Sequence, residues 1–499
     1  MKRLFATKSL DLLLEEMAGE HRLHRVLGPV SLTAMGIGTI IGAGIFVVIG
    51  AVAHDTTGPA IIVSLMVSGV ACVFAALCYA EFASMAPVAG SAYTYAYATL
   101  GELFAWIIGW DLILEYTVAA SSVALGWSHY FQNLIGMLGV SIPECIARAP
   151  FDNDPLTGHL VLTGTFIDLP AFLVSALLTI ILVLGIKESA RFNAVMVVIK
   201  LSVVLFVIVV GAFYVIPENW HPFAPFGWKG LSFFGGSLTW GEISAGKPLG
   251  MLAGAGIMFF AYIGFDCVST QAEEARNPQR DVPIGIIASL MICTVLYIAV
   301  AAVLTGMVPA KDIQIDAPIS AAFGQVGIPW AQSIIGIGAM AGLTSVLLTL
   351  MLGQPRILLA MARDGLLPKS VFAAIHPRFR TPWKSSIITG AAVATLSSLI
   401  PLRVLLELVN IGTLLAFVMV CLAVLIMRRT NPNATRPFRC PFVPLTPILG
   451  TVLCLVLMLA LPPANWWRLL LWLLVGFYIY YRYGRHHSVL AKERAKEKD

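Results

Sequence analysis

The chain has 499 residues, of which 58% are hydrophobic and only 12% are charged. Its mean hydropathy is +0.86 and its formal net charge is +5. This composition excludes a water-soluble globular protein, whether enzyme or nucleic-acid-binding module, and is typical of a polytopic membrane protein.

Residues 1–29 precede the first apolar stretch. They begin with basic residues, but Asp11, Glu15 and Glu16 interrupt the apolar run, and no small-residue cleavage site follows. A secretory signal peptide needs an unbroken apolar region and such a site. We therefore predict a cytoplasmic N-terminal segment that forms an amphipathic helix.

Apolar stretches then recur along the chain, each near the length of about 20 residues that a helix needs to cross the hydrocarbon core. Twelve are found, at residues 30–53, 59–82, 100–127, 169–186, 192–216, 249–271, 284–308, 331–361, 385–400, 404–427, 444–461 and 467–483. No hydrophilic stretch is long enough for a separate soluble domain. The prediction is an all-α polytopic membrane protein with 12 transmembrane helices.

The distribution of basic residues predicts the orientation. With both termini placed in the cytoplasm, the outward loops hold few of the 32 Lys and Arg residues, namely Arg148, Lys229, Lys247, Lys311, Arg403 and Arg468. Cytoplasmic loops of membrane proteins carry an excess of Lys and Arg, so this orientation is favoured over its inverse. The basic residues at 484–499 then form a cytoplasmic tail, and we expect the protein in the cell membrane.

A faint internal repeat links the first and sixth apolar stretches. GIGTIIGAGIF, residues 36–46, is echoed by GAGIMFFAYIGF, residues 254–265. If the repeat unit has five spans, an odd number, its second copy enters the membrane in the opposite direction from the first. This predicts an inverted pair of repeats at 30–216 and 249–427. Two additional helices, at 444–483, follow the second repeat.

The glycines in both stretches predict interrupted helices. Glycine costs about 1 kcal/mol relative to alanine in a helix, and unpaired main-chain groups survive in a membrane only where they are buried or line a polar cavity. The amides of Gly42, Ala43 and Gly44 would face an anion, and carbonyls at Phe260, Ala261 and Ile263 a cation. An amino acid zwitterion fits both; the alternative is that the glycines only allow close helix packing.

Several motifs together resemble the amino acid-polyamine-organocation transporter superfamily, and within it the bacterial relatives of the cationic amino acid transporters. They are IGTIIGAGIFV at 37–47, YAEFASMAPVAGSAYTYAYATLGE at 79–102, FFAYIGFD at 259–266, EEARNPQRDVPIGI at 273–286, RDGLLP at 363–368 and NIGTLLAF at 410–417. The resemblance covers residues 25–485. It implies a leucine-transporter-like fold, with a 5+5 inverted repeat plus two C-terminal helices, and alternating access around a central amino acid site.

The resemblance also assigns the substrate site to the two interruptions. The substrate carboxylate is expected at Gly42–Gly44, next to Ile40, and its amino group at the carbonyls of Phe260, Ala261 and Ile263, with the Phe260 ring as a gate. Many relatives carry Ser or Thr at position 43, where this chain has Ala43. A hydroxyl contact to the carboxylate is therefore absent. Leu350 is expected to limit the volume of the pocket, unless it is simply a core residue.

Ionisable residues inside membrane spans are functional candidates. Lys200 matches the position where proton-coupled relatives carry a lysine that bridges helices 1 and 8; a snorkelling lysine and a permanently charged tether are the alternatives. Glu115 aligns with an acidic residue near the substrate pocket of the relatives. It is expected either to contact the substrate directly or to act as a proton relay. Asp111, one turn earlier, is expected to be a hydrogen-bonded bundle residue. Asp266 would bias the cavity toward cations.

The function expected from these observations is secondary active transport of an L-amino acid, cationic (arginine, lysine or ornithine), with proton coupling through Lys200 and Glu115. Two alternatives stay open: exchange of one amino acid for another, and proton symport with a broader specificity that includes small neutral amino acids. We expect no enzyme activity, metal or cofactor and no nucleic acid partner. The partners are the substrate, protons and lipid; the sequence neither identifies nor excludes a small membrane subunit.

Overall fold

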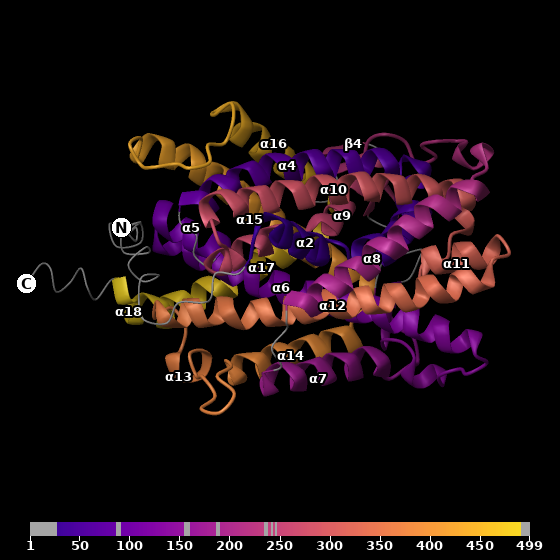
Figure 1. The fold of residues 1–499 in the computed structure, drawn as a ribbon, viewed down its shortest axis with the longest axis horizontal. Coiled ribbons are helices and arrows are strands. Elements are labelled where there is room, and N and C mark those ends of the chain that lie inside the picture. The colour runs from indigo at the N-terminus through magenta and orange to yellow at the C-terminus, as the bar shows by residue number, and fades with distance from the viewer. Residues whose placement is uncertain are drawn as a thin grey trace, which may run out of the picture.

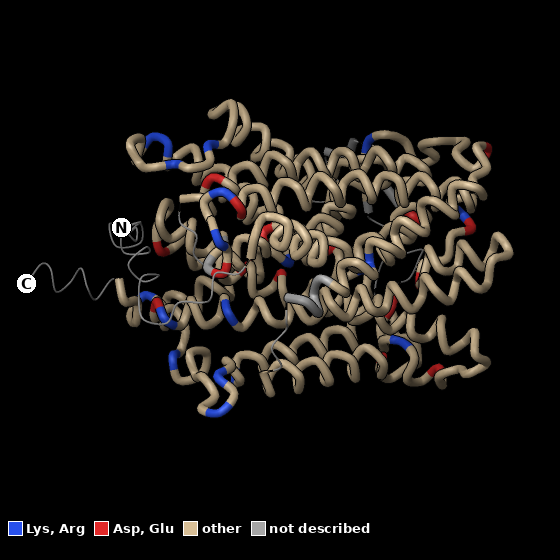
Figure 2. Tube along the Cα trace, in the orientation of Figure 1, with Lys and Arg blue, Asp and Glu red and all other residues tan. Residues whose placement is uncertain are grey.

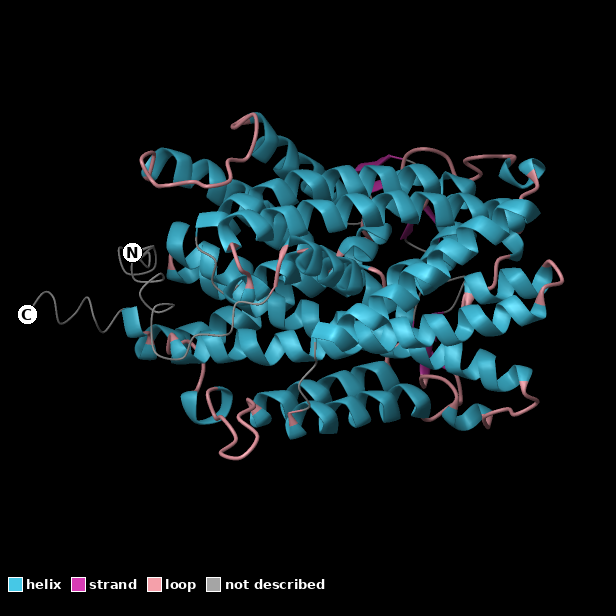
Figure 3. Cartoon of the chain, viewed as in Figure 1, coloured by secondary structure: helices cyan, strands magenta, loops and turns pink. Residues whose placement is uncertain are grey.

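The computed structural model describes residues 27–85, 91–153, 160–185, 190–233, 238–240, 243–244 and 247–490. The predicted N-terminal helix within 1–29 and the end of the basic tail therefore lie almost entirely outside the described residues. In the described part, long helices run along the long axis of a single bundle (Figures 1 and 3). Their apolar sequences account for this arrangement, because every main-chain group in a helix is paired within its own segment.

The bounds of the helices are as follows. The first half of the chain contains α2 (Pro29–Ile40), η1 (Gly44–Val48), α3 (Ile49–Val52), η2 (Ala53–Thr57), η3 (Gly58–Ala60), α4 (Ile61–Met85), α5 (Ser91–Thr99), α6 (Glu102–Met137), η4 (Glu144–Ile146), α7 (Leu169–Leu184), α8 (Ala190–Gly211), η5 (Ala212–Tyr214) and η6 (Pro217–Trp220). The second half contains α9 (Met251–Met258), η7 (Phe259–Tyr262), η8 (Asp266–Glu274), α10 (Pro278–Met307), η9 (Ala310–Asp312), α11 (Pro318–Gln325), α12 (Pro329–Arg363), α13 (Lys369–Phe372), α14 (Trp383–Leu399), α15 (Leu402–Thr430), α16 (Leu445–Leu459), α17 (Pro463–Ile479), η10 (Tyr480–Gly484) and α18 (Arg485–His487).

The predicted apolar stretches all overlap helices, but the helices differ in length. Within the described residues, seven helical runs are long and apolar enough to cross a membrane, and eight if α16 and the run from α17 to α18, bent by 111°, form one span. α2 and α7 are shorter apolar helices. The chain is thus a polytopic helical membrane protein, and the number of 12 crossings stays a prediction.

Both predicted interruptions are present. In the first stretch, α2 ends at Ile40, the next residue is extended, and a π-helix begins at Gly44. In the sixth stretch, α9 passes into the 3-10 helix η7, Ile263 leaves the helical conformation with ψ 134°, and Gly264 has φ +116° before η8 begins. A positive φ of this kind favours glycine, which explains why the sequence places one there.

Helices from the two predicted repeats pack in pairs. α4 packs on α10, α6 on α12, α7 on α14, and η1 on η7. Each contact joins apolar stretches that lie five apart in the predicted order. The pairing supports the inverted repeat of 30–216 and 249–427, which stays a prediction, as do the domain boundaries.

The all-α prediction misses three small hairpins in the long loops. β1 (Phe151–Asn153) pairs antiparallel with β2 (Leu160–Leu162), β3 (Leu231–Phe233) with β4 (Leu238–Trp240), and β5 (Ile243–Ser244) with β6 (Lys247–Pro248). Phe151 lies opposite Leu162, Leu231 opposite Trp240, and Ile243 opposite Pro248. The strands are two or three residues long, too short for an alternating pattern to be recognised in the sequence.

Lys and Arg residues gather at the end of the bundle that carries α13 and α18 (Figure 2). Arg363 ends α12, Arg428 and Arg429 lie in the last turn of α15, and Arg485 begins α18. This asymmetry along the axis supports the predicted orientation, in which that end faces the cytoplasm.

Candidate substrate-binding site

The two helix interruptions lie directly against each other. Gly44 faces the main chain of Ala261 so closely that a Cβ on Gly44 would overlap the Cα of Ala261. The hydroxyl of Thr39 lies 2.9 Å from the carbonyl oxygen of Gly264 and also 2.9 Å from that of Gly36 in its own helix, so its proton is shared between them. The breaks thus form one continuous region of irregular main chain inside the bundle.

The first break exposes main-chain donors. The amide of Phe46 donates to the carbonyl of Gly42 at 3.2 Å and so begins the hydrogen bonding of the second half-helix. The amides of Gly42, Ala43 and Gly44 precede this bond, at the positive end of the half-helix. Val346 of α12 stands beside them, 3.1 Å from where a Cβ on Gly42 would lie. This geometry can accept a carboxylate.

The second break exposes main-chain acceptors, with one local exception. The amide of Ile263 donates to the carbonyl of Phe260 at 3.2 Å, which occupies one lone pair of that oxygen. The carbonyls of Ala261 and Ile263 follow at the end of the short 3-10 helix, where the dipole is negative. An ammonium group placed here would meet carbonyl oxygens, while the carboxylate of the same molecule met the amides of the first break.

Side chains from other helices hold the end of α2. Lys200 of α8 donates from Nζ to the carbonyl of Gly38 at 2.6 Å, and Tyr297 of α10 donates to the carbonyl of Ile40 at 2.7 Å. The last carbonyls of a helix have no partner within the helix. These two bonds satisfy the carbonyls of Gly38 and Ile40, so Ile40, a predicted substrate residue, has its carbonyl engaged by the protein.

Lys200 is fully buried, with 0% of its surface exposed. Its aliphatic stem passes α12, where a Cβ on Gly342 would lie 3.2 Å from Lys200 Cγ. The lysine therefore lies between α2 and α12, which are the first and eighth apolar stretches. The alternative of a lysine that snorkels to the membrane surface is wrong, because the ammonium group ends at the Gly38 carbonyl inside the bundle.

Two predicted carboxylates lie near the breaks. Glu115 and Asp266 are 3% and 1% exposed, and the two groups interact electrostatically. Glu115 Oε2 and Asp266 Oδ1 have no hydrogen-bond partner in the described part of the chain. Tyr116, next to Glu115, is hydrogen-bonded to Cys267, next to Asp266, at 3.1 Å, which links α6 to η8. Buried carboxylates with unused oxygens can take up a proton or a cationic ligand.

The expectation for Asp111 is wrong. Both of its carboxylate oxygens lack a hydrogen-bond partner among the described residues, although the side chain is only 1% exposed. It faces Gly412 of α15, where a Cβ would lie 2.6 Å from Asp111 Oδ1. Glycine offers space there but no side-chain donor. Asp111 also interacts electrostatically with Glu115, one turn further along α6.

Apolar side chains complete the region. Phe260, Ile263 and Leu350 are all buried, and Leu350 lies one turn from Val346 on α12. Their surroundings fit a pocket wall, whereas the roles of Phe260 as a gate and of Leu350 as a limit on volume stay predictions.

Sequence reasoning did not identify four residues of this region. They are Thr39, Tyr130, Tyr297 and Val346; Tyr130 donates to the carbonyl of Phe46 at 2.7 Å. A tyrosine hydroxyl inside an apolar stretch needs a partner, so Tyr297, within 284–308, could have been singled out as a cap for a broken helix. Tyr130 lies beyond the predicted stretch 100–127 and carried no such signal. Val346 carried no such signal either.

The chain is similar to known permeases and transporters. The sequence model of the family described as amino acid permease matches residues 27–479. The branched-chain amino acid permease BcaP of Bacillus subtilis (strain 168) is 46% identical over 488 residues, which cover 98% of this chain and 99% of that protein. The methylthioribose transporter of the same organism is 44% identical over 492 residues, covering 99% and 100%. The vacuolar cationic amino acid transporter 4 of Arabidopsis thaliana is 39% identical over 415 residues, covering 83% and 65%.

These relatives are named as permeases or transporters, which is consistent with the expectation that the chain is not an enzyme. The family match extends over nearly all of the helical bundle, including both interruptions. The chain is a multi-pass membrane protein that belongs to the amino acid permease family of the amino acid-polyamine-organocation superfamily.

Proposed function

We propose that the chain is a proton-coupled symporter of L-amino acids that works by alternating access. The observation that carries the proposal is the contact of the two helix breaks at Gly44 and Ala261. Main-chain donors on one side and acceptors on the other match the carboxylate and the ammonium of an amino acid. The family match supports amino acid transport in general.

For the substrate side chain we propose an aliphatic group of the branched-chain or small neutral class. Val346, Leu350 and Ile263 give the region beside the breaks an apolar wall. A relative named as a branched-chain amino acid permease matches this chain over almost the full length of both proteins. An apolar wall of this kind favours an aliphatic side chain because burial removes its surface from water.

A cationic side chain is the second candidate, and the buried carboxylates favour it. Glu115 and Asp266 each leave one oxygen without a partner in the described residues, so a guanidinium or ammonium group could pair with them. Relatives named as cationic amino acid transporters match a smaller share of the chain. If the substrate side chain is aliphatic, these two carboxylates take part in proton binding and do not contact the substrate side chain.

Coupling is proposed at Lys200 and Glu115. Lys200 joins α8 to the end of α2 at Gly38, so a change in its charge acts directly on the broken helix. Glu115 is buried beside Asp266, and loss of its proton would place two negative charges near each other. Binding or release of a proton at either residue would therefore shift the balance between the outward-open and inward-open forms.

The test is uptake by the purified protein in sealed proteoliposomes with an inward proton gradient. We expect labelled leucine to accumulate, and an excess of unlabelled isoleucine to suppress it more strongly than arginine does. Accumulation of arginine but not of leucine would replace the aliphatic class by the cationic one. Uptake that needs internal amino acid and ignores the gradient would favour exchange, and flux that does not saturate would contradict the transporter proposal.

A further inference from the structure

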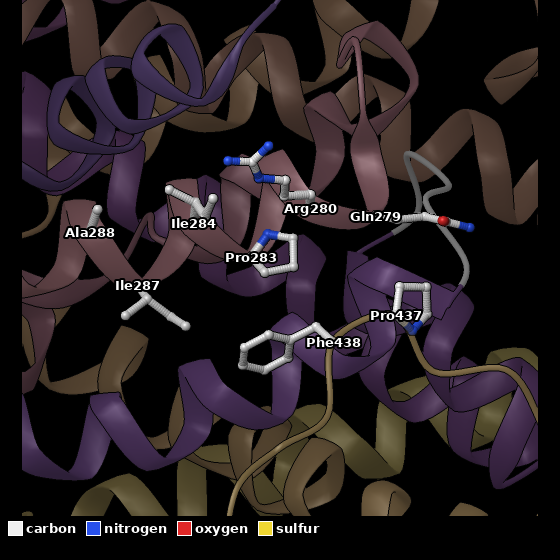
Figure 4. Close-up of a pocket in the computed structure, with 8 residues that line it drawn as sticks. All are labelled: Gln279, Arg280, Pro283, Ile284, Ile287, Ala288, Pro437 and Phe438. Carbon is white, nitrogen blue, oxygen red and sulfur yellow. The ribbon is translucent and has the colours of Figure 1, made fainter.

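A surface groove lies apart from the substrate site. It has a volume of about 510 Å³ and is formed by the first turns of α10 and by the connection between α15 and α16. Figure 4 shows Gln279 and Pro437 at one end, Ile287 and Ala288 at the other, and Arg280 and Phe438 on opposite sides between them. None of the residues assigned to the substrate lines it.

The wall of the groove changes from polar to apolar along α10. Gln279 and Arg280 are followed about one turn later by Ile284 and about two turns later by Ile287, and Met291 follows on the exposed side of the helix. At about 1.5 Å per residue, Gln279 and Met291 are roughly 18 Å apart along the axis. Ile284 and Met291 are 40% and 48% exposed, which is expected of side chains in contact with lipid. The groove thus opens toward the hydrocarbon at one end and toward the polar interface at the other.

Arg280 is the charged group of the groove. Its side chain is exposed, and it has no ion-pair or hydrogen-bond partner within the described residues. It lies in the first turn of α10, across the groove from Phe438, which belongs to the connection that follows the basic last turn of α15. The Arg280 guanidinium has no partner among the described residues, and it lies next to the Gln279 amide and the apolar wall. It is therefore suited to a phosphodiester that carries acyl chains.

The opposite wall is held in place by the rest of the protein. Ser84 of α4 accepts a hydrogen bond from the amide of Phe438 at 3.2 Å. Glu81, one turn earlier, pairs with Arg428 at 2.7 Å and with Arg436 at 3.2 Å, and it accepts the amide of Cys440 at 2.7 Å. These contacts fix the connection on both sides of Phe438, so the groove is a formed site.

We propose that this groove binds one anionic phospholipid, with the phosphate at Arg280 and Gln279 and an acyl chain along Ile284, Ile287 and Phe438. The bound lipid joins α10 to the connection between α15 and α16. It therefore stabilises the packing of α10 on α4, independently of which amino acid is transported.

The experiment measures lipid binding by the purified full-length protein. Native mass spectrometry in detergent, with phosphatidylglycerol or phosphatidylcholine added at equal concentration, counts bound lipids, and thermal unfolding reports their effect on stability. We expect one retained phosphatidylglycerol and an increase in Tm, with about tenfold weaker retention of phosphatidylcholine. In Arg280→Gln, retention of phosphatidylglycerol falls to the level of phosphatidylcholine.

Two further variants separate the site from general surface charge. Arg429→Gln removes another exposed arginine at the same end, on α15 and outside the groove, and is expected to retain the lipid as the unchanged protein does. Ala288→Trp fills the apolar end, keeps Arg280, and is expected to lose the lipid. Equal retention of both lipids, equal loss in Arg429→Gln, or an equal increase in Tm with inorganic phosphate alone would each overturn the proposal.

Discussion

Gly44 in the first apolar stretch packs against the main chain of Ala261 in the sixth, and this contact leaves no room for a side chain. We expect Gly44→Ala to separate the two breaks and to abolish amino acid uptake, with a loss of stability of about 1–3 kcal/mol from overpacking. Uptake and thermal unfolding measure the two effects. Gly136→Ala is the matched control, because a Cβ on Gly136 meets no atom within 4 Å; normal uptake by Gly44→Ala would contradict the proposed site.

Lys200→Met is expected to stop accumulation driven by a proton gradient. The substitution keeps much of the aliphatic stem, but leaves the Gly38 carbonyl without the ammonium that now bonds to it. The unsatisfied buried carbonyl should cost about 1–3 kcal/mol of stability. Accumulation driven by the proton gradient reports coupling, whereas counterflow needs only substrate binding and translocation, so the two measurements separate these properties. Counterflow by a folded Lys200→Met variant together with full accumulation would remove Lys200 from the coupling mechanism.

Glu115 and Asp111 lie one turn apart on α6, and the same substitution should affect them differently. We expect Glu115→Gln to lose accumulation that depends on the proton gradient, because Glu115 is the carboxylate beside Asp266. Asp111→Asn should keep it and should unfold at the same or a higher temperature, since both oxygens of Asp111 are buried without a described partner. Loss of accumulation in Asp111→Asn would place Asp111 in the proton path.

Asp168 offers a test of the fold that does not depend on transport. Its Oδ1 accepts the Ala171 amide at 3.0 Å and the Ser128 hydroxyl at 2.7 Å, which caps α7. We expect Asp168→Ala to lower stability by about 0.5–2 kcal/mol, while Asp168→Asn keeps an acceptor and is largely tolerated. Thermal unfolding of both variants beside the unchanged protein gives the comparison.

The same residue gives a pH dependence. Burial raises the pKa of Asp168 above its ordinary value, against the hydrogen bonds from Ser128 and Ala171, which lower it. The folded state therefore binds the proton more tightly than the unfolded state, and stability falls as pH rises through the folded pKa. Asp168→Asn should remove this fall, so on acidification the Tm of the unchanged protein should rise relative to that of Asp168→Asn. A difference that is constant across pH would contradict the raised pKa.

The helix breaks could be predicted from sequence because glycine clusters leave a local signal. Gly42 and Gly44 lie in the first interruption, and Gly264, with its positive φ, lies in the second. Lys200 could also be singled out as an ionisable residue inside an apolar stretch, although the sequence left a snorkelling lysine open. Local composition is sufficient for such features, since each depends mainly on residues within one helix.

Features that join distant parts of the chain were not predicted. Glu81 pairs with Arg428 across 347 positions, and Tyr297 donates to the carbonyl of Ile40 across 257 positions. The unsatisfied state of Asp111 depends on Gly412, which lies on another helix. A single sequence indicates which polar side chains need a hydrogen-bond or ion-pair partner. Which residue becomes that partner depends on how the helices pack.

The position of Thr39 has a consequence for motion. Its hydroxyl donates to the carbonyl of Gly264, and the main chain of Gly44 packs against that of Ala261. The two broken segments are therefore joined by two separate contacts. They should therefore tilt together as one rigid pair during each cycle. In the proposed alternating-access cycle, the displacement would then occur where this pair packs against α8 and α12, and the Lys200 ammonium lies at that boundary.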